Sequence, residues 1–92
     1  MMKYEWDENK RIKNLRKHRV DFVDAKLLFN GYTLTFEDNR ITYEEQRFIT
    51  LGLIRERVFV VVHTERKESI RIISMRKATK NEQKMYYTEF PH

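Results

Sequence analysis

The side chains of this sequence that are best suited to chemistry are cations, internal histidines and carboxylates near the ends of apolar runs. His63 ends one apolar run at residues 58–62, and Arg76 with Lys77 ends another at residues 70–75. Such groups are sufficient to cleave RNA, because the 2′-hydroxyl of the RNA is itself the nucleophile. The protein then has to accept one proton, neutralise the phosphate and protonate the 5′-oxygen. RNA cleavage without a metal ion is therefore one reaction that these residues would support.

The histidines and the cations beside them also have structural interpretations. A histidine such as His63 is more often a satisfied residue in the core or at its rim than a catalyst. Lys17 and His18 come at the end of a predicted helix, where the helix dipole alone favours cations. These two interpretations, catalytic and structural, both remain open for each of the three residues.

The other polar candidates are similarly divided. Arg76 emerges from a predicted core strand, so it requires either a phosphate or a carboxylate as a partner. Arg66 lies in a predicted hairpin turn, where a solvated side chain is the simpler interpretation. Glu45 directly precedes the strand predicted at residues 46–53, and a structural alternative is that Glu45 and Arg47 form ion pairs across strands.

Metal and thiol chemistry are poorly supported by the sequence. The chain has no cysteine, which excludes a disulfide, a thiolate zinc site and a cysteine nucleophile and favours a reducing cytoplasm. His18, His63 and His92 are scattered, and the adjacent Glu44 and Glu45 would point apart on a strand. No glycine-rich phosphate loop or G-x-S-x-G motif is present. We therefore expect no metal and no cofactor.

The charge distribution favours a polyanionic partner. The formal net charge is +5 and the sequence pI is about 9.6. Residues 3–19 carry seven Lys and Arg against three acids, and residues 66–84 carry seven against two, whereas residues 20–65 carry five against eight. If the two basic ends meet in the fold, they would form one positive face that attracts nucleic acid. The alternative is a surface with evenly scattered, solvated lysines.

The first third of the chain predicts a short strand and two helices. Residues 3–6 are consistent with an edge strand, and Asp7 with the N-cap of a helix that continues to about His18. Ile12 and Leu15 would lie on the buried side of this helix and its cations on the exposed side. Asp21 would cap a second helix, which Asn30 and Gly31 would end.

The remainder predicts four strands and a last helix. Alternating or continuous apolar residues predict strands at residues 33–37, 46–53, 58–64 and 70–76, with Leu34 and Phe36 inward on the first. The last two are apolar on both faces, as central strands are. Thr79 and Glu82 have the spacing of a capping box that starts a third helix, which Pro91 would end.

These elements predict a single domain over residues 1–92, of the α+β class. We expect an antiparallel sheet of about four strands, packed on one face against two N-terminal helices and a C-terminal helix. The hairpin between the last two strands would place His63 and Arg66 at one rim, and Ser74 and Arg76 toward the opposite rim. No apolar run is long enough to cross a membrane, so we expect a cytoplasmic protein.

The order and spacing of particular residues resemble the BrnT family over nearly the whole chain. Arg19 departs from the family, which usually has glycine at this position; a glycine there would supply a left-handed helix stop. The residues that carry the resemblance are Glu5-Trp6-Asp7, Lys10, Asn14, Lys17-His18, Val20, Phe22, Ala25, Glu45, Arg47, Gly52, Val61-Val62-His63-Thr64, residues 71–78, Glu82 and Tyr86.

This resemblance implies a ribonuclease toxin of a bacterial type II toxin–antitoxin pair with a RelE-like fold, which inhibits translation and growth. It also implies neutralisation by a ribbon-helix-helix antitoxin of the BrnA type, in a 2:2 complex that binds operator DNA through the antitoxin. By position it assigns activity to Lys17, His63 and Arg76, and less strongly to Glu45 and Arg66. The further candidates for RNA contact are Lys10, Lys13, His18 and Lys77.

Two other functions remain compatible with the sequence. The chain could be a non-catalytic RNA-binding or scaffold domain that pairs with a DNA-binding partner. It could also be a purely structural interaction domain, which would not bind RNA. The two basic ends favour the ribonuclease and the RNA-binding module over the structural domain.

Overall fold

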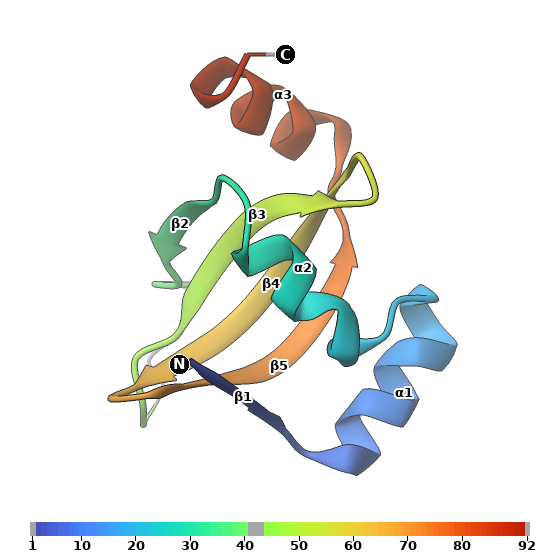
Figure 1. The fold of residues 1–92 in the computed structure, drawn as a ribbon, viewed down its shortest axis with the longest axis vertical. Coiled ribbons are helices and arrows are strands. Elements are labelled where there is room, and N and C mark those ends of the chain that lie inside the picture. The colour runs from blue at the N-terminus through green and yellow to red at the C-terminus, as the bar shows by residue number, and fades with distance from the viewer. Residues whose placement is uncertain (1, 41–43, 92) are drawn as a thin grey trace.

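The computed structural model describes residues 2–40 and 44–91 (Figure 1). The secondary structure follows the predicted order, with one 3₁₀ turn (η1) where the second helix was expected to begin. The elements are β1 (Lys3–Trp6), α1 (Glu8–His18), η1 (Phe22–Asp24), α2 (Ala25–Phe29), β2 (Leu34–Glu37), β3 (Phe48–Ile54), β4 (Arg57–Arg66), β5 (Ser69–Lys77) and α3 (Lys80–Glu89).

The strands form one five-stranded mixed sheet with the order β1-β5-β4-β3-β2. β2 to β5 are the predicted antiparallel meander, but β1 adds a fifth strand and pairs in parallel with β5. The prediction of four antiparallel strands is therefore corrected. A parallel pair needs a long connection, and here most of the chain separates β1 from β5, so local sequence patterns did not indicate the pairing.

The helices cover both faces of the sheet, so the prediction of one covered face is wrong. On one face, Phe22 of η1 and Leu28 of α2 pack against Val61 of β4. On the other face, Tyr86 of α3 packs against Val60. The central strands are apolar on both sides, and each apolar side requires a cover. Figure 1 shows α2 across the middle of the sheet and α3 at one end of it.

The inward residue of α1 is polar. Ile12 and Leu15, predicted to be buried, are 38% and 36% exposed, whereas Asn14 is 8% exposed. The amide of Asn14 donates to the Met75 carbonyl at 2.8 Å and accepts from the Met75 N–H at 3.2 Å. β1 pairs with β5 only as far as Ile72. Asn14 therefore provides the donor and acceptor that a longer β1 would have offered to the free edge of β5.

The helix ends follow the sequence signals. Asp7 accepts from the Lys10 N–H at 3.1 Å, and Thr79 with Glu82 forms the predicted capping box. Arg19, in place of the family's glycine, has the left-handed conformation (φ 60°), and its N–H donates to the Leu15 carbonyl. The backbone stop expected of a glycine is thus made by an arginine, in a region of φ that is strained for a residue with a Cβ.

One glycine sets how closely α2 approaches the sheet. Gly52 lies on β3 opposite Phe59, directly under Leu28. A Cβ atom at this position would lie 2.6 Å from Cγ of Leu28. Leu28 is fully buried in the core, so the missing side chain of Gly52 is what permits this contact.

Candidate functional site

α3 covers only part of its face of the sheet, and the rest is partly open. Alternate residues of a strand point to the same side, so the strand register identifies which side chains share the face of Val60. Val62, Ile49 and Ser74 are only partly buried there, and Phe36, predicted to point inward, is 39% exposed. We name this surface the open sheet face. It consists of Phe36, Ile49, Val62, Thr64, Arg71, Ser74 and Arg76.

An apolar row crosses the open sheet face between two arginines. Phe36 pairs with Ile49, Ile49 with Val62, and Val62 with Ser74, so one row crosses β2 to β5. On one side of this apolar row, the neighbouring pair on β4 and β5 is Val60 with Arg76. On the other side of the apolar row, Arg71 of β5 pairs with Thr64 of β4 and with Glu5 of β1. An apolar strip with guanidinium groups on both sides is suited to an anionic chain that carries flat, apolar groups.

Arg76 is held in place by a carboxylate of α3. Its guanidinium donates to both oxygens of Glu82, at 2.7 and 2.9 Å. This pair raises the pKa of Arg76 and lowers the pKa of Glu82 to about 2. The positive charge of Arg40 acts against the rise in the pKa of Arg76, so these two arginines lie near each other. Arg40 is itself bound by the buried carboxylate of Asp38, with two contacts of 2.8 Å.

A buried hydroxyl group lies on the Arg71 side of the apolar row. Thr64 is 2% exposed, and its Oγ1 has no hydrogen-bond partner among the described residues. Thr64 pairs with Arg71, and β5 contains an extra residue at Ile73, where its register with β4 shifts. Such β-bulges redirect side chains and are common beside functional sites. A buried hydroxyl without a protein partner is uncommon, and this one lies next to an arginine of the open sheet face.

His63, predicted as a catalytic residue, lies in the core of the opposite face. It is 1% exposed, and its Nε2 is 2.7 Å from Oγ1 of Thr50. Its ring is in edge contact with Phe29 and stacks near Phe48, at centroid distances of 5.1 and 5.9 Å. Burial lowers the pKa of His63 to about 4, partly offset by the backbone of Thr64. This position favours a role in the core over direct proton transfer to RNA.

Four of the predicted residues line a groove beside α1. This α1 groove has a volume of about 240 Å³ and runs between the helix and β5. Arg76 is not one of its walls, so Lys17 and Arg76 do not share this groove, although the sequence predicted that the two basic ends could form one positive face. Ser74 belongs both to the α1 groove and to the open sheet face, and it therefore connects the two basic surfaces. The residues that line the groove are Lys10, Lys13, Asn14, Lys17, His18, Ile73 and Ser74.

Glu45 and Arg66, also predicted, lie together near the β4–β5 hairpin. Their side chains form an ion pair at 3.6 Å, and both are about half exposed. Because Arg66 shares the side of Thr64 on β4, this pair borders the open sheet face at the end away from α3. Lys77, the remaining predicted residue, lines a separate pocket against α3.

Arg40, Arg71 and Thr64 were not among the site residues predicted from the sequence. Arg71 did carry a signal, because it is the single charged position within the apolar stretch from Ile70 to Ile73. Among the described residues, no three His, Asp or Glu side chains are grouped closely enough to hold a metal ion. No helix in the described part of the chain has the length and apolarity needed to span a membrane.

The fold and these surfaces define a small, basic α+β protein suited to a polyanionic ligand. Residues 6–82 match the family described as ribonuclease toxin, BrnT, of type II toxin-antitoxin systems, and the chain belongs to that family. Membership implies an RNA substrate and a protein antitoxin as partner. A search of curated proteins found no match. The matched residues include the α1 groove and, from Phe36 to Arg76, the whole open sheet face.

Proposed function

We propose that this chain cleaves RNA without a metal ion and that the open sheet face binds the RNA around the broken bond. The observation that carries this proposal is the apolar row of Phe36, Ile49 and Val62 between Arg71 and Arg76. Bases would lie on the apolar row, and the guanidinium groups would contact the phosphates on either side.

In the proposed reaction the 2′-oxygen attacks phosphorus and the bond from phosphorus to the 5′-oxygen breaks. The products are a 2′,3′-cyclic phosphate and a 5′-hydroxyl. Arg76 and Arg71, on either side of the apolar row, stabilise the charge of the attacked phosphate and of the phosphate next to it. Glu45, at the border of the open sheet face, and Lys17, which RNA would reach by crossing β5 at Ser74, are the accessible candidates for accepting the 2′-hydroxyl proton and donating one to the 5′-oxygen. His63 supports the sheet beneath the site and does not contact the RNA.

We further propose that the partner is a ribbon-helix-helix antitoxin of the BrnA type, in a 2:2 complex that binds operator DNA. The fold would then be RelE-like, the toxin would act on translation, and the cytoplasm would be its location. The exposed Ile12 and Leu15 on the cationic helix α1 support an acidic or amphipathic antitoxin segment there.

The test is cleavage of a labelled RNA by the purified protein in excess EDTA. We expect cleavage with cyclic phosphate ends, and a loss of about 100-fold or more in kcat/KM for Arg76→Ala and for Arg71→Ala. Lys26→Ala is the control, because Lys26 is an exposed cation of α2 on the other side of the sheet. Circular dichroism checks that each variant is folded. Cleavage that requires added Mg²⁺, or that survives both arginine substitutions, would contradict the proposal.

A non-catalytic RNA-binding module is the second candidate. It is favoured by one observation, the burial of His63 away from the open sheet face. The same assay separates the two functions: a binding module retains RNA in a salt-dependent manner but releases no cleaved product on long incubation.

A further inference from the structure

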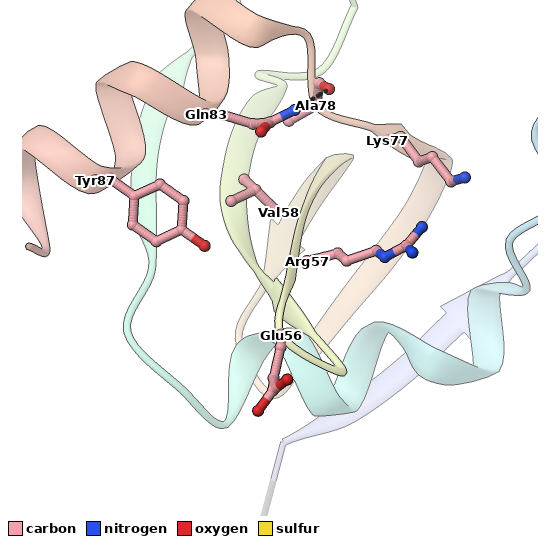
Figure 2. Close-up of a pocket in the computed structure, with 7 residues that line it drawn as sticks. All are labelled: Glu56, Arg57, Val58, Lys77, Ala78, Gln83 and Tyr87. Atoms are coloured by element: carbon pink, nitrogen blue, oxygen red, sulfur yellow. Dashed lines mark hydrogen bonds between the residues drawn. The ribbon is translucent and has the colours of Figure 1, made fainter. Parts of the chain in front are cut away.

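A pocket outside the open sheet face has the chemistry of a nucleotide site. It lies between α3 and the turn that joins β3 to β4, and its volume is about 310 Å³ (Figure 2). This size is at the lower end of the range for small-molecule sites. The residues that line it are Glu56, Arg57, Val58, Lys77, Ala78, Gln83 and Tyr87.

One side of the pocket has a flat apolar surface and an amide. The ring of Tyr87, which is in edge contact with Tyr86, stands beside Val58 (Figure 2). Gln83 Nε2 donates to the Ala78 carbonyl at 3.3 Å, so the amide is oriented and its oxygen can accept a further bond. A tyrosine face and an oriented amide are the groups that bind an unstacked base by its ring and its edge.

The other side of the pocket is cationic. Arg57 of β4 and Lys77 of β5 are both exposed, and they extend to the same side of the pocket (Figure 2). Glu56, the only acid in its lining, points away from Gln83 and Tyr87 (Figure 2). Lys80 and Lys84 border the adjoining hollow on α3, which also contains Gln83 and Tyr87. Two cations therefore line the pocket, and two more border the hollow that shares Gln83 and Tyr87 with it.

We propose that this pocket is a second nucleotide subsite, which holds one base of single-stranded RNA on Tyr87 and its phosphate between Arg57 and Lys77. The inference rests on the proposed function and extends it to an RNA segment beyond the broken bond. Lys77 directly follows Arg76 at the end of β5, but the two side chains point to opposite faces, because Arg76 pairs with Val60 and Lys77 with Phe59. An RNA strand that leaves the open sheet face at Arg76 therefore has to pass around the end of β5 to reach the pocket. Gln83 and Tyr87 lie beyond residue 82, where the family match ends, so this subsite would extend the RNA contact outside the matched region.

The test compares two RNAs, one of only the two nucleotides at the broken bond and one extended by several nucleotides on both sides. Tyr87→Leu keeps apolar bulk but removes the stacking surface. We expect it to raise the KM of the long RNA about tenfold and to leave its kcat and both constants of the short RNA within twofold. Tyr87→Phe keeps the ring and should raise the KM of the long RNA much less than Tyr87→Leu does, and the control Lys26→Ala should match the wild type. The double variant Arg57→Ala/Lys77→Ala changes only exposed side chains and should also raise the KM of the long RNA.

An equal effect of Tyr87→Leu on both RNAs, or on neither, would overturn the subsite. If the wild type cleaves neither RNA, the proposed function fails and the subsite is tested by binding alone. Titration of the ¹⁵N-labelled protein with the long RNA should then shift the Gln83 side-chain amide and the Tyr87 backbone amide. Shifts confined to other residues, or no binding, would overturn the inference. Thermal melting shows whether Tyr87→Leu is folded, and the double variant decides the question if it is not.

Discussion

His63 and Thr64 are consecutive residues that point to opposite faces of β4. The imidazole completes a buried hydrogen-bonded row with Thr50 and Thr35, in which the two threonine oxygens are 2.8 Å apart. The Thr64 hydroxyl lies beside Arg71 under the open sheet face. His63, whose side chain is of a type suited to catalysis, thus supports the core, while the less reactive Thr64 borders the candidate site.

We predict that His63 makes stability depend on pH in the mildly acidic range. Its pKa is about 4 in the folded chain, below the usual 6.5, so the unfolded chain binds the proton more readily. The stabilisation is present above about pH 6.5 and is lost as the pH falls toward 4. Urea denaturation of the wild type should lose about 2–3 kcal/mol over this window, and His63→Phe should lose correspondingly less.

The activity of the same variant separates the two roles of His63. His63→Phe keeps an aromatic ring between Phe29 and Phe48, and Thr50 keeps Thr35 as a partner. A core role predicts a change in kcat of less than about threefold at pH 7.5, whereas loss of a general acid or base costs about 100-fold or more. A loss of the second size in a folded variant would restore His63 to the catalytic residues.

At the scale of elements, signals confined to a few neighbouring residues predicted the structure well. The N-caps at Asp7 and Asp21 and the capping box at Thr79 are all present, because each involves bonds between residues close in the sequence. Glu82 shows the limit of this approach. Its place in the capping box was predicted, but its pairing with Arg76 was not, because that pairing depends on where α3 meets the sheet.

The failed predictions concern contacts between distant parts of the chain. Asn14 is buried because the edge of β5 needs a partner 61 residues away, and no helical periodicity encodes that need. Phe36 alternates with Leu34 as a buried residue would, yet α3 covers Leu34 and leaves Phe36 partly exposed. For the same reason, the α1 cations and Arg76 were predicted as site residues, but the position of Ser74 between the α1 groove and the open sheet face was not.

The close packing of α2 on the sheet predicts that substitutions at Gly52 and Leu28 have coupled effects on stability. Gly52→Ala places a methyl group against the Leu28 side chain, and overpacking of this kind costs about 1–3 kcal/mol. Leu28→Ala alone leaves a cavity and costs about 2–5 kcal/mol. We expect the double variant to lose less stability than the two single variants lose in total, because the methyl group at residue 52 fills part of the cavity left by Leu28→Ala. Urea denaturation of all four proteins measures the coupling, and simple additivity would contradict this contact.

For the molecule as a whole, the two basic ends of the sequence meet along β5. α1 carries the first basic segment, and Asn14 fixes it to β5, which lies within the second. The two basic segments are therefore neighbours, as a single positive face would require. The cations nevertheless lie on two sides of β5, with Lys17 in the α1 groove and Arg76 on the open sheet face. A single RNA strand would contact both only by crossing β5 at Ser74.

The salt dependence of RNA affinity tests this crossing. Each phosphate contact on a single strand contributes about 0.7 to the slope of log affinity against log salt concentration. We expect Lys17→Ala and Arg76→Ala each to reduce the slope by about 0.7 and the double variant by about 1.4, with no change for Lys26→Ala. If Arg76→Ala alone reduces the slope, the RNA does not enter the α1 groove. Lys10, Lys13, Lys17 and His18 would then be the surface at which we propose that an acidic segment of the protein antitoxin binds.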